Sequence, residues 1–178
     1  VGRLVAAGHD MAVANRTQSR SSAPVAGGAR SAENPASAVE GVDAVFAMVS
    51  DDEASREVWQ GPQGVLAGRP ARGALAIECS TLSSDRVAEL SGATVAAGLR
   101  YLDCPVTGLP DMAAAGTLTL LVGGATEDLD TARPLLAPLA ERILHFGPVG
   151  SGTAYKLIVN LIGAVQIAGV AEGLAIAE

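Results

Sequence analysis

The sequence predicts an α/β fold in which helices cover both faces of a doubly wound, mostly parallel sheet, followed by one long C-terminal helix. Short β-like runs alternate with helical runs along the chain, which is the pattern of parallel strands joined by crossover helices. Ala, Val and Leu dominate the apolar residues, and aromatic residues make up only 3% of the total. Small aliphatic side chains are typical of helices packed closely on a buried sheet.

Strands and helices alternate regularly through the first half of the chain. The strands are predicted over 10–15, 43–49 and 74–79, and the helices from near Thr17, over 53–59 and over 84–97. The Ser50-Asp51-Asp52 cluster is typical of a helix N-cap, because its oxygens accept the free amide protons of the first turn. Ser83 is predicted to cap the third helix in the same way, and Gly61-Pro62 ends the second.

The second half continues the alternation and ends in the long helix. The strands are predicted over 99–103, 117–122 and 142–146, the helices over 127–139 and 153–178, and the connections over 105–110 and 147–152. Pro134 and Pro138 are expected to shorten or kink the first of these helices. The last helix is apolar nearly all round, so it needs partners on several sides.

Both ends of the chain are expected to be cuts rather than natural termini. A doubly wound domain opens with a strand and a G-x-G-x-x-G turn, whereas 3–7 already has the pattern of a helix end. At the other end, the chain stops inside an apolar helix. The predicted domain therefore covers 1–150 without its first strand and Gly-rich loop, and 151–178 starts a helix that leads to a further helical domain outside the chain.

The bulk properties exclude several functions. The net charge is −7 and no run is rich in Lys or Arg, so binding to nucleic acid is not expected. Cys79 and Cys104 lack C-x-x-C spacing, and His9 and His145 stand alone, so neither a disulfide framework nor a metal site is expected. A reducing cytoplasm is the expected location. The apolar stretch 157–171 is shorter than the roughly 20 residues of a membrane span, so it is predicted to be a buried helix.

The loop after the first predicted strand has the residues of a nucleotide site. Ligands of open α/β sheets lie at the carboxyl ends of the strands, and a fold that prefers NAD has Asp or Glu in this loop for the ribose 2′-hydroxyl. This chain has Asn15, Arg16 and Thr17 instead, with Arg20 one helical turn on. An arginine suits the 2′-phosphate of NADP. The sequence therefore favours NADP(H) as the cofactor and leaves NAD(H) open. The alternative is that Arg16 is a solvated loop residue that contacts no cofactor.

Hydroxyl groups follow the next two strands. Ser50 and Asp51 follow the strand over 43–49, and Ser80 and Thr81 follow the strand over 74–79. Side chains at these places act as helix caps, as cofactor contacts or as both. The sequence leaves these interpretations open.

A lysine and an asparagine in the last helix have the spacing of a catalytic pair. Lys156 and Asn160 are four residues apart, so they share one face of the helix. Their neighbours are apolar, and burial lowers the pKa of a lysine toward the working pH, as proton transfer to a carbonyl oxygen requires. Asn160 would bind the same substrate or hold the ammonium in place. The alternative is a lysine that reaches from the helix start into water.

Four segments of the chain carry motifs that occur together in one enzyme family. They are D-C-P-V-T-G at 103–108, G-T-L at 116–118 with Gly123-Gly124, the segment 150–160, and Gly8-His9 with N-R-T at 15–17. In that order they resemble the D-x-P-V-S-G substrate motif, the G-T-L…V-G-G segment, the G-x-G-x3-K-x3-N segment and the A-G-H…N-R-T stretch of the β-hydroxyacid dehydrogenases. That family includes 3-hydroxyisobutyrate dehydrogenase, tartronate semialdehyde reductase and the glyoxylate/succinic semialdehyde reductases. The matches are collinear across essentially the whole chain.

The resemblance implies a Rossmann-like NAD(P)-binding domain of an oxidoreductase that transfers a hydride between NADP(H) and a small 3-hydroxyacid or semialdehyde. It implies that Lys156 is the catalytic lysine with Asn160 as its partner, and that Thr107 and Gly108 hold the substrate carboxylate. It also implies a homodimer or larger oligomer for the full-length form. The implied cofactor contacts are Asn15, Arg16 and Thr17 at the 2′-phosphate, Met48, Val49 and Ser50 at the adenosine ribose, and Thr81 near the nicotinamide.

Departures from the family pattern leave the substrate open. Leu109 stands where the family usually has a second Gly, Met112 where it often has Gly, and Pro110 removes an amide donor. One alternative function is an imine reductase, which shares the N-R-T segment but generally lacks the lysine. Another is a catalytically inactive nucleotide-binding or dimerisation fragment, since the phosphate loop and second domain are not in the chain.

Overall fold

The computed structural model describes residues 1–177 and has a six-stranded sheet at its centre, with the order β3-β4-β5-β7-β6 and with β8 beside β7. Strands β3, β4 and β5 are parallel, β8 is parallel to β7, and β7 runs antiparallel to β5 and β6. A separate parallel pair is formed by β1 and β2. The strands are β1 (Ala12–Val13), β2 (Arg30–Ser31), β3 (Ala44–Ala47), β4 (Leu75–Glu78), β5 (Arg100–Asp103), β6 (Val106–Thr107), β7 (Leu118–Gly123) and β8 (Ala140–Gly147).

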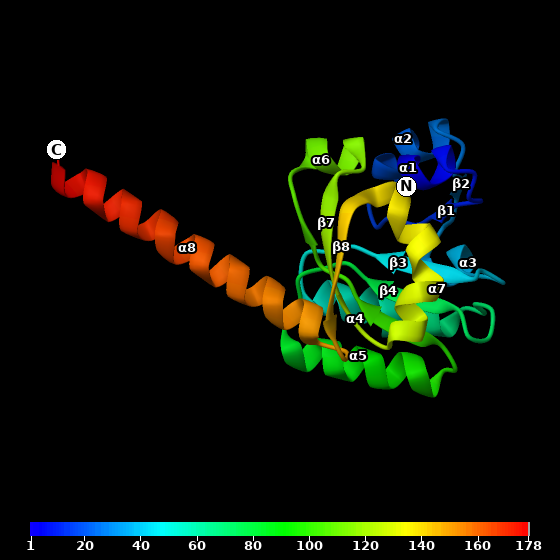
Figure 1. Cartoon of the computed structure of the whole chain (residues 1–178). Coiled ribbons are helices and arrows are strands. Elements are labelled where there is room, and N and C mark those ends of the chain that lie inside the picture. Colours follow the sequence, from blue (N-terminus) through cyan, green and yellow to red (C-terminus); the bar gives the residue numbers. More distant parts are fainter. Residues whose placement is uncertain (178) are drawn as a thin grey trace.

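Helices pack on both faces of this sheet, which confirms the predicted α/β fold (Figure 1). Helices α4 and α5 contribute to the core on one face and α7 to the core on the other, while α8 extends away from the sheet. The helices are α1 (Gly2–Ala6), η1 (Gln18–Ser21), α2 (Ser22–Ala26), α3 (Pro35–Ala38), α4 (Asp52–Gln60), η2 (Val65–Ala67), α5 (Ser84–Ala96), α6 (Pro110–Ala115), α7 (Thr126–Leu136), η3 (Ala137–Leu139) and α8 (Ser151–Ala177).

Two apolar cores lie on opposite faces of the sheet. On one face Ala76 of β4 joins Trp59 and Leu90, and on the other Ile77 of β4 joins Leu129. Neighbouring residues of a strand point to opposite faces, so a strand buried on both sides needs the continuous apolar run that the sequence has here. Full burial of each large apolar side chain contributes roughly 1.5–3 kcal/mol to the stability of the fold.

The predicted helix caps are confirmed. The Asp51 carboxylate accepts the amide of Ala54 at 2.8 Å, and the Ser83 hydroxyl accepts the amide of Arg86 at 3.1 Å. In the helix predicted over 127–139, the α-helical part ends at Leu136 and a 3₁₀ turn with Pro138 follows. The Asp51 and Ser83 caps fix where α4 and α5 begin, in the loops that follow β3 and β4.

Several short elements were not predicted. The segment 105–110, expected to be a turn, contains β6 and the first residue of α6. Pro110 is tolerated there because the first turn of a helix leaves its amides unpaired, and Gly116 ends α6 with a φ of +75°. Helix α3 begins with the same signal, since Asn34 caps it, Pro35 follows and Ser37 completes a capping box. These elements are too short to show a hydrophobic period.

The first turn of α8 lies directly on β7. Gly152 and Thr153 are buried, and a Cβ atom on Gly152 would collide with the carbonyl oxygen of Leu121 and lie 2.9 Å from the amide nitrogen of Gly123. Glycine at 152 is therefore what allows the backbone of the helix to approach the backbone of the strand.

The predicted burial of 157–171 is wrong within the described chain. Helix α8 extends away from the domain (Figure 1), and Leu161, Val165 and Ile167 are each more than 60% exposed. The helix has 27 residues and is therefore longer than the apolar stretch 157–171 that it contains. It is long and apolar enough to span a membrane by length and composition.

The close approach at Gly152 generates a test with a matched control on the same helix. Gly152→Ala is expected to lower the free energy of unfolding by about 1–3 kcal/mol, because the helix start must move away from β7. Gly163→Ala, where nothing lies within 4 Å of the new Cβ, is expected to raise it by roughly 0.5–1 kcal/mol through helix propensity. Urea unfolding followed by circular dichroism measures both. Equal effects of the two substitutions would contradict the tight packing of the first turn.

Candidate functional site

The loops after β1 and β3 each carry a charged residue, Arg16 and Asp51. The Ala54 amide and the Ser50 hydroxyl hold the pKa of Asp51 below its usual value, and the nearby Arg16 guanidinium adds to this lowering. In the β1 loop, the side-chain oxygen of Asn15 accepts the amide of Thr17 at 2.9 Å. This local turn fixes the backbone around Arg16, whose side chain is exposed to solvent.

The loops after β3 and β4 are tied by two sets of hydrogen bonds. The amide of Val49 donates to the buried Ser80 hydroxyl oxygen at 2.7 Å. The carboxylate of Asp52 accepts the amide and the hydroxyl of Ser83 at 2.9 and 2.6 Å. Partial burial alone would raise the pKa of Asp52, but these Ser83 donors lower it below its usual value. The starts of α4 and α5 are therefore held side by side at the carboxyl edge of the sheet.

These contacts separate the polar residues that hold the loops from those that face solvent. Ser80 is buried and bonded to Val49, so its hydroxyl joins two loops rather than capping a helix. Ser50 is exposed and donates to Asp51 at 2.7 Å, which leaves its oxygen lone pairs accessible. Thr81 is exposed, and Met48 presents 60% of its surface. The edge thus offers hydroxyl groups beside an apolar side chain.

A buried aspartate at the end of β5 holds the start of α8. The two carboxylate oxygens of Asp103, which has no exposed surface, accept the amide of Gly150 at 2.7 Å and the amide of Thr153 at 2.8 Å. The amides at a helix N-terminus lack partners within the helix and carry a partial positive charge, so a carboxylate satisfies both needs. Asp103 thereby fixes the position of the first turn of α8.

Lys156 lies one turn beyond this anchor. It is half-buried, and Asn160, one further turn along the helix, is exposed. The ring of Tyr155 stacks on Phe146 of β8 with 4.2 Å between centroids, which adds a second contact between this turn and the sheet. Lys156 is also the only lysine in the sequence. The sequence predicts a lysine buried among apolar neighbours, and within the described chain Lys156 is only half-buried.

The predicted carboxylate-binding residues lie farther along β7, on and after β6. Thr107 pairs with Thr119 of β7, and its side chain is exposed. Gly108 has a φ of +143°, and a Cβ there would lie 2.7 Å from the Leu118 side chain, so glycine is required. Strand β7 therefore carries Thr107 along one part of its length and the start of α8 along another.

The structure brings some of the predicted residues together. Ser80 joins the loop of Met48, Val49 and Ser50 to the loop of Thr81, while Asn15, Arg16 and Thr17 follow β1 in the separate strand pair. Strand β6 carries Thr107 along β7, and the start of the helix that carries Lys156 and Asn160 packs on the same strand. Asp103, Ser80 and Asp52 hold the loops and the helix start in place. The sequence named them as a motif residue, a cap or cofactor contact, and a cap residue, but did not predict these roles. Their sequence signal is an acid or hydroxyl at the last position of a buried strand or just after it.

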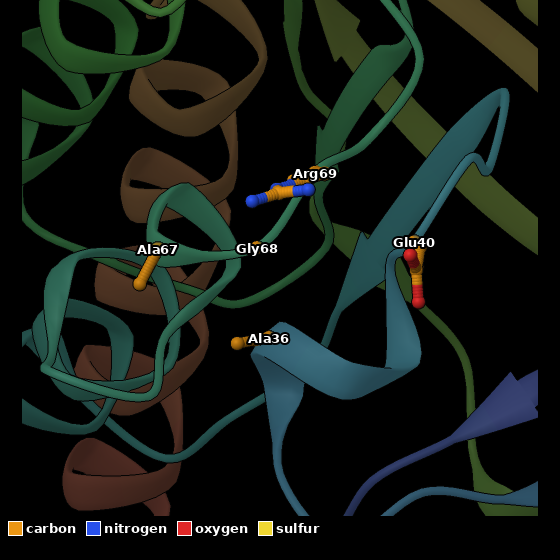
Figure 2. Close-up of a pocket in the computed structure, with 5 residues that line it drawn as sticks. All are labelled: Ala36, Glu40, Ala67, Gly68 and Arg69. Carbon is orange, nitrogen blue, oxygen red and sulfur yellow. The ribbon is translucent and has the colours of Figure 1, made fainter.

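A shallow hollow lies at the opposite edge of the sheet (Figure 2). It is lined by Ala36, Glu40, Ala67, Gly68 and Arg69, in the segments that precede β3 and β4. Figure 2 shows Arg69 and Glu40 as its charged side chains, among small residues. Ligands of parallel sheets lie at the carboxyl ends of the strands, so the candidate site is the edge described above and not this hollow.

Comparison with known proteins places the chain in a family. Residues 1–147 match the NAD-binding domain of 6-phosphogluconate dehydrogenase. The chain is 38% identical over 173 residues to the NAD-dependent L-serine dehydrogenase of Pseudomonas aeruginosa, and the match covers 97% of this chain and 58% of that protein. The chain therefore spans less than two thirds of this relative's length.

Solved structures agree with the sequence match. The 3-hydroxyisobutyrate dehydrogenase of Mycobacterium tuberculosis, determined with L-serine, is 35% identical with a TM-score of 0.89, over 99% of this chain and 60% of that one. An imine reductase of Myxococcus stipitatus in complex with NAD⁺ has a TM-score of 0.87 at 23% identity over 98% of this chain and 59% of its own, a likeness that shows the fold alone. The chain thus belongs to the β-hydroxyacid dehydrogenase family, as its motifs indicate, and corresponds to the Rossmann-like NAD-binding domain of these oxidoreductases.

Proposed function

We propose that the full-length protein is an oxidoreductase that transfers a hydride between NADP(H) and a small 3-hydroxyacid or the matching semialdehyde. The observation that carries the proposal is the placement of Lys156, the only lysine in the sequence, one turn after the helix start that buried Asp103 holds. A proton donor is useful only where it is held in a fixed position relative to the substrate. The anchored first turn of α8 supplies that position.

The residues at the carboxyl edge fit the adenosine side of such a cofactor. Arg16, Thr17 and Asn15 offer donors to a 2′-phosphate, and Met48 offers an exposed apolar surface beside the Ser50 hydroxyl. The nearby carboxylates of Asp51 and Asp52 already accept hydrogen bonds from Ala54 and Ser83. The sequence contains no G-x-G-x-x-G turn, so it offers the pyrophosphate no such loop.

The chemistry divides between the cofactor and the protein. The nicotinamide cofactor, when bound, supplies or accepts the hydride. Lys156 donates a proton to the carbonyl oxygen during reduction and accepts one from the hydroxyl group during oxidation. Asn160, on the same helix face, hydrogen-bonds the substrate or the lysine, and Thr107 with the Gly108 amide holds the carboxylate. The substrate is a small carboxylate-bearing molecule, and Leu109 and Pro110 next to Gly108 shape its site.

The cofactor proposal is tested by calorimetric titration of the chain with NADPH and with NADH. Arg16→Ala is expected to weaken NADPH binding by about 10- to 100-fold and to leave NADH binding unchanged, because a charge-assisted hydrogen bond to phosphate contributes about 1.5–3 kcal/mol. Arg69→Ala, which removes the same charge at the opposite edge of the sheet, is the control. Tighter binding of NADH than of NADPH would sink the preference, and no binding of either would support the inactive-fragment alternative for this chain.

The catalytic proposal is tested in the full-length protein. Lys156→Ala is expected to lower kcat by roughly 10²–10⁴-fold with little change in cofactor affinity, because a general acid is lost. Lys156→Arg is the control, since it keeps the charge but holds its proton too tightly to transfer it. Recovery of activity in Lys156→Arg would show that only the positive charge matters. Turnover of a cyclic imine but of no semialdehyde would instead identify an imine reductase.

A further inference from the structure

A buried polar cluster under the nucleotide edge takes no direct part in the proposed chemistry. Glu78, the last residue of β4, is 1% exposed. Its carboxylate accepts the Ser55 hydroxyl at 3.1 Å, the Trp59 indole nitrogen at 2.8 Å and the amide of Ser80 at 3.0 Å. The donors come from α4 and from the loop after β4, so this single side chain joins two elements.

A buried arginine completes this cluster. Arg86 of α5 has no exposed surface, and its Nε donates to the Ser55 hydroxyl oxygen at 3.2 Å. Its guanidinium also pairs with Glu89 at 3.1 Å and donates to Gln60. A buried positive and a buried negative group are thus joined through Ser55. Breaking a buried pair of charges is strongly destabilising. The cluster therefore constrains α4, α5 and β4 together through these hydrogen bonds, although Nη2 of Arg86 has no partner among residues 1–177.

The cluster reaches the nucleotide edge through Ser80. Glu78 holds the Ser80 amide, and the Ser80 hydroxyl accepts the amide of Val49. Val49 stands between Met48 and Ser50, and Thr81 follows Ser80 directly. The predicted cofactor contacts on these two loops are Val49 itself and direct neighbours of Val49 or Ser80. Glu78 holds the Ser80 amide directly, and it holds the Val49 amide through Ser80.

The surroundings of Glu78 do not require a carboxylate for packing. On this face of the sheet Trp59, Leu90 and Tyr101 are buried in an apolar core. Burying a carboxylate costs desolvation free energy, which an apolar side chain at position 78 would avoid. The carboxylate is therefore best explained by the donors that it aligns.

We propose that Glu78 is a positioning residue that holds the loops after β3 and β4 in the arrangement that binds the dinucleotide. The proposal rests on the proposed function for its ligand, an adenine dinucleotide at the carboxyl edge of the sheet. Glu78 does not touch the nucleotide in this proposal, and it acts through Ser80 and Val49.

The test compares Glu78→Gln with Ile77→Val in the chain as it stands. Glutamine keeps the shape of the side chain, but its NH2 group replaces one of the two oxygens and so faces either the Ser80 amide or the Ser55 and Trp59 donors. Ile77→Val removes one methylene from the neighbouring residue, which faces the other core, and controls for lost stability. The readouts are hydrogen exchange at the Val49 and Ser80 amides, NADPH affinity by calorimetry, and the emission of Trp59, the only tryptophan.

Glu78→Gln is expected to speed exchange at both amides and to weaken NADPH binding by about tenfold or more, with a shift in Trp59 emission. Ile77→Val is expected to leave all three unchanged at a temperature where both variants are folded. Unchanged exchange in folded Glu78→Gln, or equal changes in Ile77→Val, would overturn the proposal. If the wild-type chain binds no NADPH, the cofactor proposal for this chain fails, while the exchange rates still decide the role of Glu78.

Ser80→Ala keeps the test decisive if Glu78→Gln does not fold. It removes the oxygen that accepts the Val49 amide and leaves the Glu78, Ser55 and Trp59 contacts in place. Faster exchange at Val49 and weaker NADPH binding with unchanged Trp59 emission are expected. Wild-type exchange at Val49 in this variant would refute the connection between the two loops.

Discussion

The carboxylate of Asp103 accepts the amides of Gly150 and Thr153 and so joins the end of β5 to the first turn of α8. A buried carboxylate is unfavourable unless its oxygens are satisfied, and a helix N-terminus supplies both donors and a partial positive charge. Gly152 and Gly123 have no side chains, which lets the two backbones meet at this point. The position of Lys156 then follows from helix geometry, because it lies one turn beyond the anchor.

Asp103 and Glu78 are partners in the register of β4 and β5, and both are fully buried. Asp103 holds the helix that carries Lys156, and Glu78 holds the loops that carry the predicted cofactor contacts. Two neighbouring buried acids at the ends of parallel strands thus position the helix that carries Lys156 and the loops that carry the predicted cofactor contacts. The exposed residues above them have few contacts of their own, which is typical of binding loops placed by a rigid sheet.

Much of the fold follows from the sequence, because buried strands such as β3, β4 and β5 have unbroken apolar runs that end in capping residues. The short elements β6 and α3 have no such run, and only their Pro and Asn signals identify them. The strand-end rule and the family resemblance together predicted the candidate site residues, whose roles stay a proposal. Neither predicted Glu78 or the anchoring role of Asp103, since the role of a buried acid depends on which amides the fold brings to it. Helix α8 is exposed within the described chain because burial depends on partners and not on composition alone.

The scarcity of lysine gives this chain an unusual chemical behaviour. Lys156 is the only side-chain amine, and it is half-buried on the face proposed to meet the substrate. Acylating dyes, amine cross-linkers and coupling to activated sensor surfaces would all target this one residue among the side chains. Such reagents would label the chain with a defined stoichiometry but would block the proposed site. Immobilisation for binding work therefore needs a different attachment chemistry, while amine labelling itself offers a direct occupancy assay by ligand protection.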